Sequence, residues 1–178
     1  MRDEPRSGCA VNAAVAVLGD RWCLLVLRDV MFYGRRHFRD LLANSPEGIA
    51  SNILSSRLKA MVAGGLLSHE ENSRGRRGTY SLTEAGVQTV PIMVALGSWG
   101  LRHRPTTREA AVRAQLLEDG GTSLWADFMD ELRDVHLGIP RPDPERPRPS
   151  EALQAAYETA MADTANGNGS PARTPRSA

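Results

Sequence analysis

Hydrophobic residues in the first part of the chain are grouped as short, buried helices would require. The segments 11–18 and 22–31 are apolar almost throughout, and each is followed by a glycine. We expect two buried helices there, and the second should be central because it is apolar on most sides. A shorter helix over 38–44 is predicted to turn three residues inward, namely Phe38, Leu41 and Leu42.

The next predicted helix spans 49–63 and is separated from the preceding one by turn-forming residues at 44–48. Its apolar residues follow the i, i+4, i+7, i+8 spacing of one buried stripe: Leu54, Leu58, Met61 and Val62. It contains no acidic residue, although acidic side chains are common on solvated helices. Its outward side is short, polar and basic, with Arg57 at the margin and the following residues on the face: Ser51, Asn52, Ser55, Ser56 and Lys59.

A β-hairpin is predicted directly after this helix. Its strands should cover 66–71 and 79–82, the second with period-2 alternation of polar and apolar residues. The segment 72–78 between them carries three arginines separated by glycines: Arg74, Arg76 and Arg77. We expect a flexible, strongly basic loop at the tip of the hairpin.

The segment 84–103 predicts a helix that is apolar on nearly every side. Such a helix must be covered all round, and in a chain of this size a second copy of the protein is the expected cover. Thr83 should cap its N-terminus. Pro91 lies inside the pattern and predicts a kink or an early break.

Beyond residue 105 the pattern predicts additional helices. The capping-box sequence from Thr106 to Glu109 should begin a helix that ends near residue 118. A second helix over 123–136 should bury an apolar stripe made of Leu124, Phe128, Leu132 and Val135. Its opposite face is acidic, and we interpret it as a solvated one: Asp127, Asp130, Glu131 and Asp134.

The predicted fold class is mainly α with a small β-hairpin wing: a winged helix-turn-helix with additional C-terminal helices. Prolines between 140 and 149 predict an extended linker, followed by a short helix over 150–162. We therefore expect four segments: a disordered N-terminus over 1–8, a DNA-binding and dimerisation domain over 9–105, a helical extension over 106–138, and a Pro-rich linker with a largely disordered tail over 139–178.

The formal net charge of +1 conceals an asymmetry between the two halves. Residues 1–105 hold 14 Lys and Arg against 9 Asp and Glu, whereas residues 106–178 hold 8 against 12. A basic half suits a nucleic-acid partner, but chance segregation of charge fits equally well. The charge split therefore supports a DNA-binding interpretation only together with the pattern of helices.

The dimensions of B-DNA limit which element of a protein can enter its grooves. The major groove of B-DNA admits one α-helix, and the helix over 49–63 offers one apolar face and one polar, basic face. Phosphate contacts are expected before and within the preceding helix, from Arg35, Arg36 and Arg39, and from the hairpin tip. His37 is expected to bond backbone or to pack. The alternatives are a serine-rich surface helix, a basic loop that binds nothing, and a winged-helix module that binds protein.

Several motifs in order resemble the HxlR-type transcription regulators, a branch of the MarR-like winged-helix proteins. They are CAV at 9–11, GDRW at 19–22, RHFRDL at 36–41, GIASNILSSRL at 48–58, GL at 65–66 and YSLTEAG at 80–86. The familiar proline after the N-terminal cysteine is Ala10 here. The resemblance implies a dimeric regulator whose terminal helices form the interface and which binds a palindromic double-stranded operator. It also implies that Ser51, Asn52, Ser55 and Ser56 face base edges and that Arg57, Lys59, Arg39 and the wing arginines face phosphates.

Two kinds of effector are open. Some relatives use a cysteine at the position of Cys9 as a redox sensor, and the favoured alternative is a small packing residue at the start of the first helix. Cys23 lies inside an apolar helix and is expected in the core. A small-molecule effector could bind among aromatic and apolar side chains, for which a plain core is the favoured alternative: Trp99, Trp125, Phe128 and Met129.

Other classes of protein find no support. The sequence contains none of the common hydrolase, metalloprotease, P-loop or dinucleotide motifs, so we expect no enzyme and no cofactor. The four histidines lack the spacing of metal ligands, so no metal site is predicted. The chain has no membrane-length apolar run and no secretory signal at its N-terminus, so we expect a cytoplasmic protein.

Overall fold

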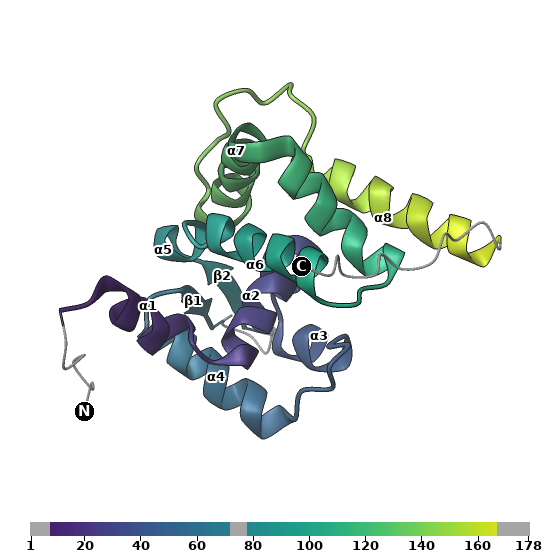
Figure 1. Ribbon diagram of the computed structural model, residues 1–178. Coiled ribbons are helices and arrows are strands. Elements are labelled where there is room, and N and C mark those ends of the chain that lie inside the picture. The colour runs from purple at the N-terminus through teal and green to yellow at the C-terminus, as the bar shows by residue number, and fades with distance from the viewer. Residues whose placement is uncertain (1–7, 72–77, 167–178) are drawn as a thin grey trace. The chain divides into compact units, whose positions relative to one another are not determined.

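The computed structural model describes residues 8–71 and 78–166, and the chain divides into two compact units, 1–86 and 87–178 (Figure 1). The expected fold class is confirmed: helices dominate the described residues, and two antiparallel strands form a hairpin. The first unit contains α1 (Ala10–Leu18), α2 (Arg21–Tyr33), α3 (Phe38–Ala43), α4 (Ser51–Ala63), β1 (Leu67–Glu70) and β2 (Thr79–Leu82).

The helix α2 is the buried centre that the sequence predicts. Asp20 caps its N-terminus, because the carboxylate accepts hydrogen bonds from the backbone N–H groups of Trp22 and Cys23. The helix ends at Gly34, which takes the left-handed conformation at φ 61°. Between these ends α2 packs against α1 and α4, and its buried apolar side chains are Cys23, Val26, Leu27, Val30 and Met31.

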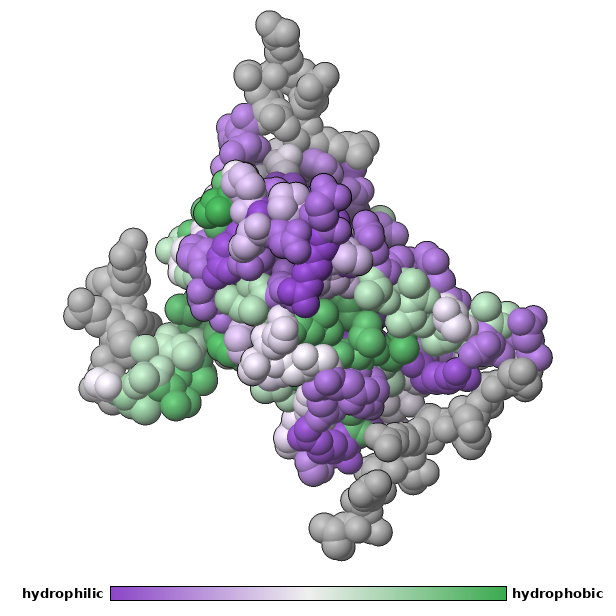
Figure 2. All heavy atoms as spheres, turned by 90° about the horizontal axis from the view of Figure 1, so that it is seen from above, coloured by the Kyte–Doolittle hydropathy of each residue, from purple (hydrophilic) through white to green (hydrophobic). Residues whose placement is uncertain are grey.

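The helix α1 differs from the prediction, which placed it in the core. None of its residues is buried, and the side chains of Val11 and Val15 are 70% and 56% exposed. These two valines are four residues apart and so share one face of the helix. Figure 2 shows the hydrophobic colour of α1 on the molecular surface, at the left of the view. The segment is a helix as expected, but the described residues of a single chain leave its apolar face uncovered.

A tight turn joins α3 to α4. Gly48 has φ 66°, and its backbone N–H donates to the carbonyl of Ser45. The helix α4 begins at Ser51, two residues later than predicted, because Ala50 before it has extended backbone, and Ile49 is buried outside the helix. Leu54, Leu58 and Met61 form the buried stripe as expected, whereas Val62 is 36% exposed and does not belong to it.

The hairpin follows α4 in a simple antiparallel register, from Leu67 opposite Leu82 to Glu70 opposite Thr79. Thr83 then begins the next helix as predicted, since its hydroxyl accepts the backbone N–H of Gly86. That helix, α5 (Glu84–Val87), is only one turn long. It stops before α6 (Val90–His103), and Pro91 lies in the first turn of α6. The break predicted from the proline is confirmed.

The second unit contains α6, α7 (Arg108–Leu137) and α8 (Pro149–Ala165), and α7 packs against both of the others. At Gly97 of α6 an added Cβ would lie 3.2 Å from the Cβ of Ala114, so the two helices approach closely. Because α6 packs on α7, the boundary between the compact units falls after residue 86.

The long helix α7 is two helices joined at Gly121, as the sequence predicts. Gly121 has φ 58° and ψ −161°, which is not helical backbone. The indole N–H of Trp125 donates to the carbonyl of Leu117 across this kink, at 2.7 Å. The N-terminal cap is Thr107, whose hydroxyl accepts the N–H of Ala110, so the predicted cap at Thr106 is wrong by one residue.

The predicted apolar stripe of the second half of α7 holds at Phe128 and Leu132, which are 1% and 4% exposed. It does not extend to Val135, which is 45% exposed. The interpretation of the opposite, acidic face as solvated is wrong. Glu131 is 4% exposed, and the segment that leads into α8 covers this face with Arg146 on Asp127 and Arg148 on Asp134.

Length and hydropathy decide whether a helix can cross a membrane. Among the helices that the structure describes, no single one is both long and apolar enough to cross a bilayer. Only α1 and α2 taken together reach those criteria, across a bend of 74°.

Candidate nucleic-acid interface

The polar side of α4 is open to solvent. Ser51, Asn52, Ser56 and Lys59 are exposed, and Ser55 is half-buried beside them. The buried stripe of Leu54, Leu58 and Met61 holds the opposite side of the helix against the first unit. A helix with one face packed and the other short, polar and acid-free can enter a DNA major groove without repelling the phosphates.

Arg57 lies at the margin of this face and is not free of protein contacts. Its Nε atom lies 3.0 Å from the Oδ1 atom of Asp20, and both side chains are 34% exposed. Asp20 precedes α2, so the ion pair joins the middle of α4 to the beginning of α2. Sequence reasoning missed this partner because 37 residues separate the two in the chain.

The three arginines around the start of α3 have different surroundings. Arg35 forms an ion pair with Asp29 at 3.2 Å and lies over the ring of Tyr33. Arg36 donates from Nε to the carbonyl of Tyr80 and from its terminal nitrogen to the hydroxyl of Ser81. Arg39 is exposed.

Arg36 therefore has a structural task at the edge of the hairpin. Its own carbonyl accepts the backbone N–H of Tyr80 at 2.8 Å, so main chain and side chain both bind β2. Next to it, His37 places its Nδ1 atom 3.1 Å from the carbonyl of Gly78, which confirms the expected backbone-bonding role. These contacts hold β2 against the segment before α3.

A network of charged groups fixes the turn before α4. Arg28 of α2 binds both carboxylate oxygens of Glu47, at 2.6 and 2.9 Å, and also binds Asp29. Burial works against the charged form of Arg28, but the hydrogen bonds to Glu47 and Asp29 outweigh it, and the pKa of the guanidinium is raised. The hydrogen bond from Arg28 lowers the pKa of Glu47. The sequence offers one clue, an adjacent arginine and aspartate inside a mainly apolar helix.

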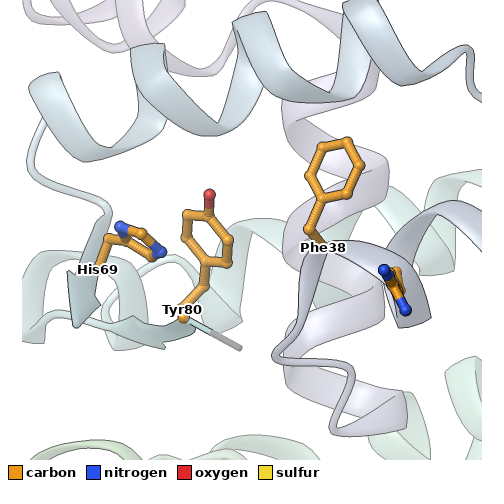
Figure 3. Close-up of a pocket in the computed structure, with 5 residues that line it drawn as sticks. Phe38, His69 and Tyr80 are labelled. Atoms are coloured by element: carbon orange, nitrogen blue, oxygen red, sulfur yellow. The ribbon is translucent and has the colours of Figure 1, made fainter. Parts of the chain in front are cut away.

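A small hollow lies between α3 and the base of the hairpin, with a volume of about 220 Å³. Figure 3 shows Phe38 on one side and Tyr80 on the other, with the ring of His69 stacked on Tyr80. The two stacked rings have centroids 4.4 Å apart, and Arg39 completes the lining. Burial raises the pKa of Tyr80. Arg39, the exposed cation of α3, therefore lies beside the base of the hairpin.

The other candidate residues are the wing arginines, two cysteines and a set of aromatic and apolar side chains. The wing arginines Arg74, Arg76 and Arg77 lie outside the described residues. Cys9 is exposed next to the start of α1, whereas Cys23 is buried in α2 as expected, and burial raises the pKa of its thiol. Trp99 is 50% exposed and Phe128 is 1% exposed. Within the described residues, no cluster of His, Cys, Asp or Glu could hold a metal ion.

The sequence profile of the HxlR-like helix-turn-helix family matches residues 17–108, which is just over half of the chain. The chain belongs to this family. The match begins in α1 and ends at the first residue of α7, so it includes the helix-turn-helix, the hairpin and α6. The rest of α7 and all of α8 lie beyond the part of the chain that the HxlR-like family defines.

Individual relatives agree with the HxlR-like assignment. An uncharacterised HTH-type transcriptional regulator of Mycobacterium tuberculosis, Rv3095, is 39% identical over 99 residues, which are 55% of this chain and 61% of that protein. Another, from Methanothermobacter thermautotrophicus, is 32% identical over 93 residues, or 52% and 70% of the two chains. The chain thus matches about three-fifths of the length of the mycobacterial relative.

A solved structure is also similar. The crystal structure of PA1607, described as a transcription factor, shares 33% identity with this chain at a TM-score of 0.49. The match covers 53% of this chain and 65% of that one.

Proposed function

We propose that this protein is a DNA-binding transcription regulator that acts as a homodimer on a palindromic operator. The observation that carries the proposal is the exposed, acid-free face of α4, held outward by the buried stripe on its other side. Membership of a helix-turn-helix family supports it, as do relatives named transcriptional regulators. In this proposal α4 lies in the major groove.

The candidate contacts fall into two groups. Ser51, Asn52, Ser55 and Ser56 are proposed to face base edges, where an asparagine can bond adenine with both amide atoms. Lys59 and Arg39 are exposed and are proposed to bind phosphates without regard to sequence. The wing arginines Arg74, Arg76 and Arg77 are proposed to bind the backbone or the minor groove beside α4.

Arg35, Arg36 and Arg57 are proposed as phosphate contacts in a weaker sense, because each already binds a group of the protein. A DNA phosphate must share or displace that group. Arg36 is the least available, since it holds β2 through two hydrogen bonds of its guanidinium. Its removal is expected to disturb the hairpin as well as any phosphate contact.

The dimer interface is proposed to use the apolar faces that the described residues of a single chain leave uncovered. On α6 the exposed residues Ile92, Leu96 and Trp99 follow the i, i+4, i+7 spacing of one helix face, and their exposures range from 42% to 50%. The exposed valines of α1 form a second such face. Stripes of this kind on a soluble protein mark an interaction site. Two copies would present two recognition helices, about one helical turn of DNA apart.

Regulation by an effector belongs to the same proposal. Cys9 is exposed, which an oxidant-sensing thiol requires. The sensing proposal predicts that mild oxidation releases DNA from the wild type and leaves Cys9→Ser bound. An alternative effector, a small apolar molecule near Trp99 and Trp125, predicts DNA release without any dependence on Cys9.

A DNA titration tests the regulator proposal. Binding to generic duplex DNA and to the region upstream of the protein's own coding sequence should be measured across a salt series. We expect Lys59→Ala, and Arg76→Ala with Arg77→Ala, to weaken binding to all sequences. Each lost phosphate contact should reduce the steepness of the plot of log K against log salt concentration by about 0.9. Asn52→Ala should instead reduce discrimination between sites, by about 1–3 kcal/mol.

The control is Arg146→Ala, which removes an exposed cation from the second unit. It should leave the salt slope unchanged. Binding of the wild type that does not depend on salt, or no binding at all, would contradict the proposal and favour a winged-helix module that binds protein. Footprinting should show two half-sites, and a single unpaired half-site would contradict the dimer.

A further inference from the structure

One carboxylate oxygen of Asp20 lies close to two different groups. The Oδ1 atom accepts the backbone N–H groups of Trp22 and Cys23, at 2.9 and 3.2 Å, and so caps α2. The same atom lies 3.0 Å from Nε of Arg57. The cap bonds fix the position of the carboxylate, because they tie it to the first turn of a buried helix.

Arg57 is the only cation within α4 besides Lys59, and it lies at the edge of the proposed DNA-facing side. Lys59 is exposed, whereas Arg57 is half-buried and paired. The contact with Asp20 is an ion pair and not a hydrogen bond, because the Nε atom of Arg57 is buried without a hydrogen-bond partner. A DNA phosphate offers Arg57 the same kind of charged partner, namely a negatively charged oxygen.

We propose that Asp20 competes with DNA phosphate for Arg57 and thereby limits the sequence-independent part of DNA affinity. The inference rests on the proposed function and adds a residue that tunes it without touching DNA. A cation that is neutralised within the protein displaces few counterions from DNA, so it contributes little to salt-dependent binding. The contacts that distinguish bases then carry a larger share of the total affinity.

The size of the effect follows from the exposure of the pair. Ion pairs that are about one-third exposed contribute modestly, because water screens them. We therefore expect release of Arg57 from Asp20 to tighten binding to generic duplex about two- to fivefold at low salt. The salt slope should steepen by up to about 0.9, the contribution of one phosphate contact.

The variant Asp20→Asn tests this directly, because asparagine caps helices about as well as aspartate but carries no charge. Affinity for generic duplex and for the operator should be measured across a salt series. We expect tighter binding to generic duplex, a steeper slope and a smaller preference for the operator. A circular dichroism melt that matches the wild type confirms that the cap of α2 is retained.

A double-mutant cycle separates competition for Arg57 from a general effect of charge. In an Arg57→Gln background, Asp20→Asn should change neither affinity nor slope. If Asp20→Asn tightens DNA binding equally in the wild type and in Arg57→Gln, the charge of Asp20 acts on DNA directly and not through Arg57. That result would overturn the proposal. Unchanged affinity and slope in the single variant would also overturn it, while DNA binding by the wild type would leave the proposed function intact.

A second measurement does not depend on the stability of the Asp20 variant. Arg57→Gln alone should cost less affinity for generic duplex than Lys59→Ala, because Arg57 is already neutralised in the free protein. Equal losses would contradict the inference. If the wild type binds no duplex at all, the proposed function fails and this inference fails with it.

Discussion

The carboxylate of Glu131 accepts hydrogen bonds from both the backbone N–H and the hydroxyl of Ser150. Glu131 is 4% exposed in the second half of α7, and Ser150 lies in the first turn of α8. A negative charge is favourable at the N-terminus of a helix, where backbone N–H groups lack partners. The acidic face of α7 therefore binds the segment that begins α8, and this contact joins the two helices.

Replacing Glu131 by alanine should destabilise the second unit. The backbone N–H and hydroxyl of Ser150 would lose their acceptor in a half-buried position, which costs about 1–3 kcal/mol. The free energy of unfolding in urea measures the loss. Asp130→Asn serves as the control, since its ion pair with Arg133 is partly exposed and three residues apart, and it should cost about 0.5 kcal/mol or less. If both variants lose the same free energy of unfolding, the hydrogen bonds between Glu131 and Ser150 contribute no more than a partly exposed ion pair.

The Arg28–Glu47 pair should make the free energy of unfolding of the first unit fall at low pH. Because folding lowers the pKa of Glu47 below its ordinary 4.5, the ionised carboxylate contributes stability above that pH. The contribution is lost as the pH falls through the lowered pKa of the folded state. Glu47→Gln should be less stable than the wild type at pH 7, by about 0.5–1 kcal/mol for a partly exposed pair.

The difference in melting temperature between the wild type and Glu47→Gln should shrink when the same comparison is made at pH 3. Glu145→Gln, which removes an exposed carboxylate from the segment between α7 and α8, controls for the change in net charge. A difference that stays constant from pH 7 to pH 3 would mean that the pair does not respond to titration of Glu47.

The exposed face of α6 should decide the oligomeric state. Leu96→Lys places a charge in the middle of the proposed interface, and a charge without a partner is costly to bury. We expect dimer to become monomer in light scattering after size exclusion. Met161→Lys is the matched control, because Met161 on α8 is 46% exposed and Leu96 is 45% exposed. A dimer that survives Leu96→Lys would move the interface away from α6.

Gly121 should be intolerant of a side chain. Its φ of 58° and ψ of −161° lie in a region that is essentially restricted to glycine, so Gly121→Ala should cost about 1–3 kcal/mol. Gly100→Ala is the opposite case, since it lies within α6 and an added Cβ meets nothing within 4 Å. It should stabilise the protein by up to about 1 kcal/mol. Thermal melts distinguish the two, and a neutral Gly121→Ala would argue for a straight α7.

Local pattern was sufficient for most elements because helices and hairpins are encoded by neighbouring residues. The spacing of Leu54, Leu58 and Met61 predicts the inward side of α4 and hence its outward polar face. The proline at 91 predicts the break before α6. Errors within the elements were mostly at ends and margins: α4 begins two residues late, the cap of α7 moves from Thr106 to Thr107, and Val62 and Val135 lie outside the buried stripes.

The order of the elements, the fold class, the family and the composition of the polar face on α4 follow from the amino-acid sequence, since each depends on spacing within a short stretch. Which charged groups are available depends on how the chain folds in three dimensions. Arg57 meets Asp20, Arg36 meets β2, and the acidic face of α7 meets Arg146 and Arg148. Such pairs join residues that are distant along the chain, so the spacing of polar and apolar residues does not predict them. Folding alone brings their charges within a few ångströms, where the electrostatic energy between them becomes significant.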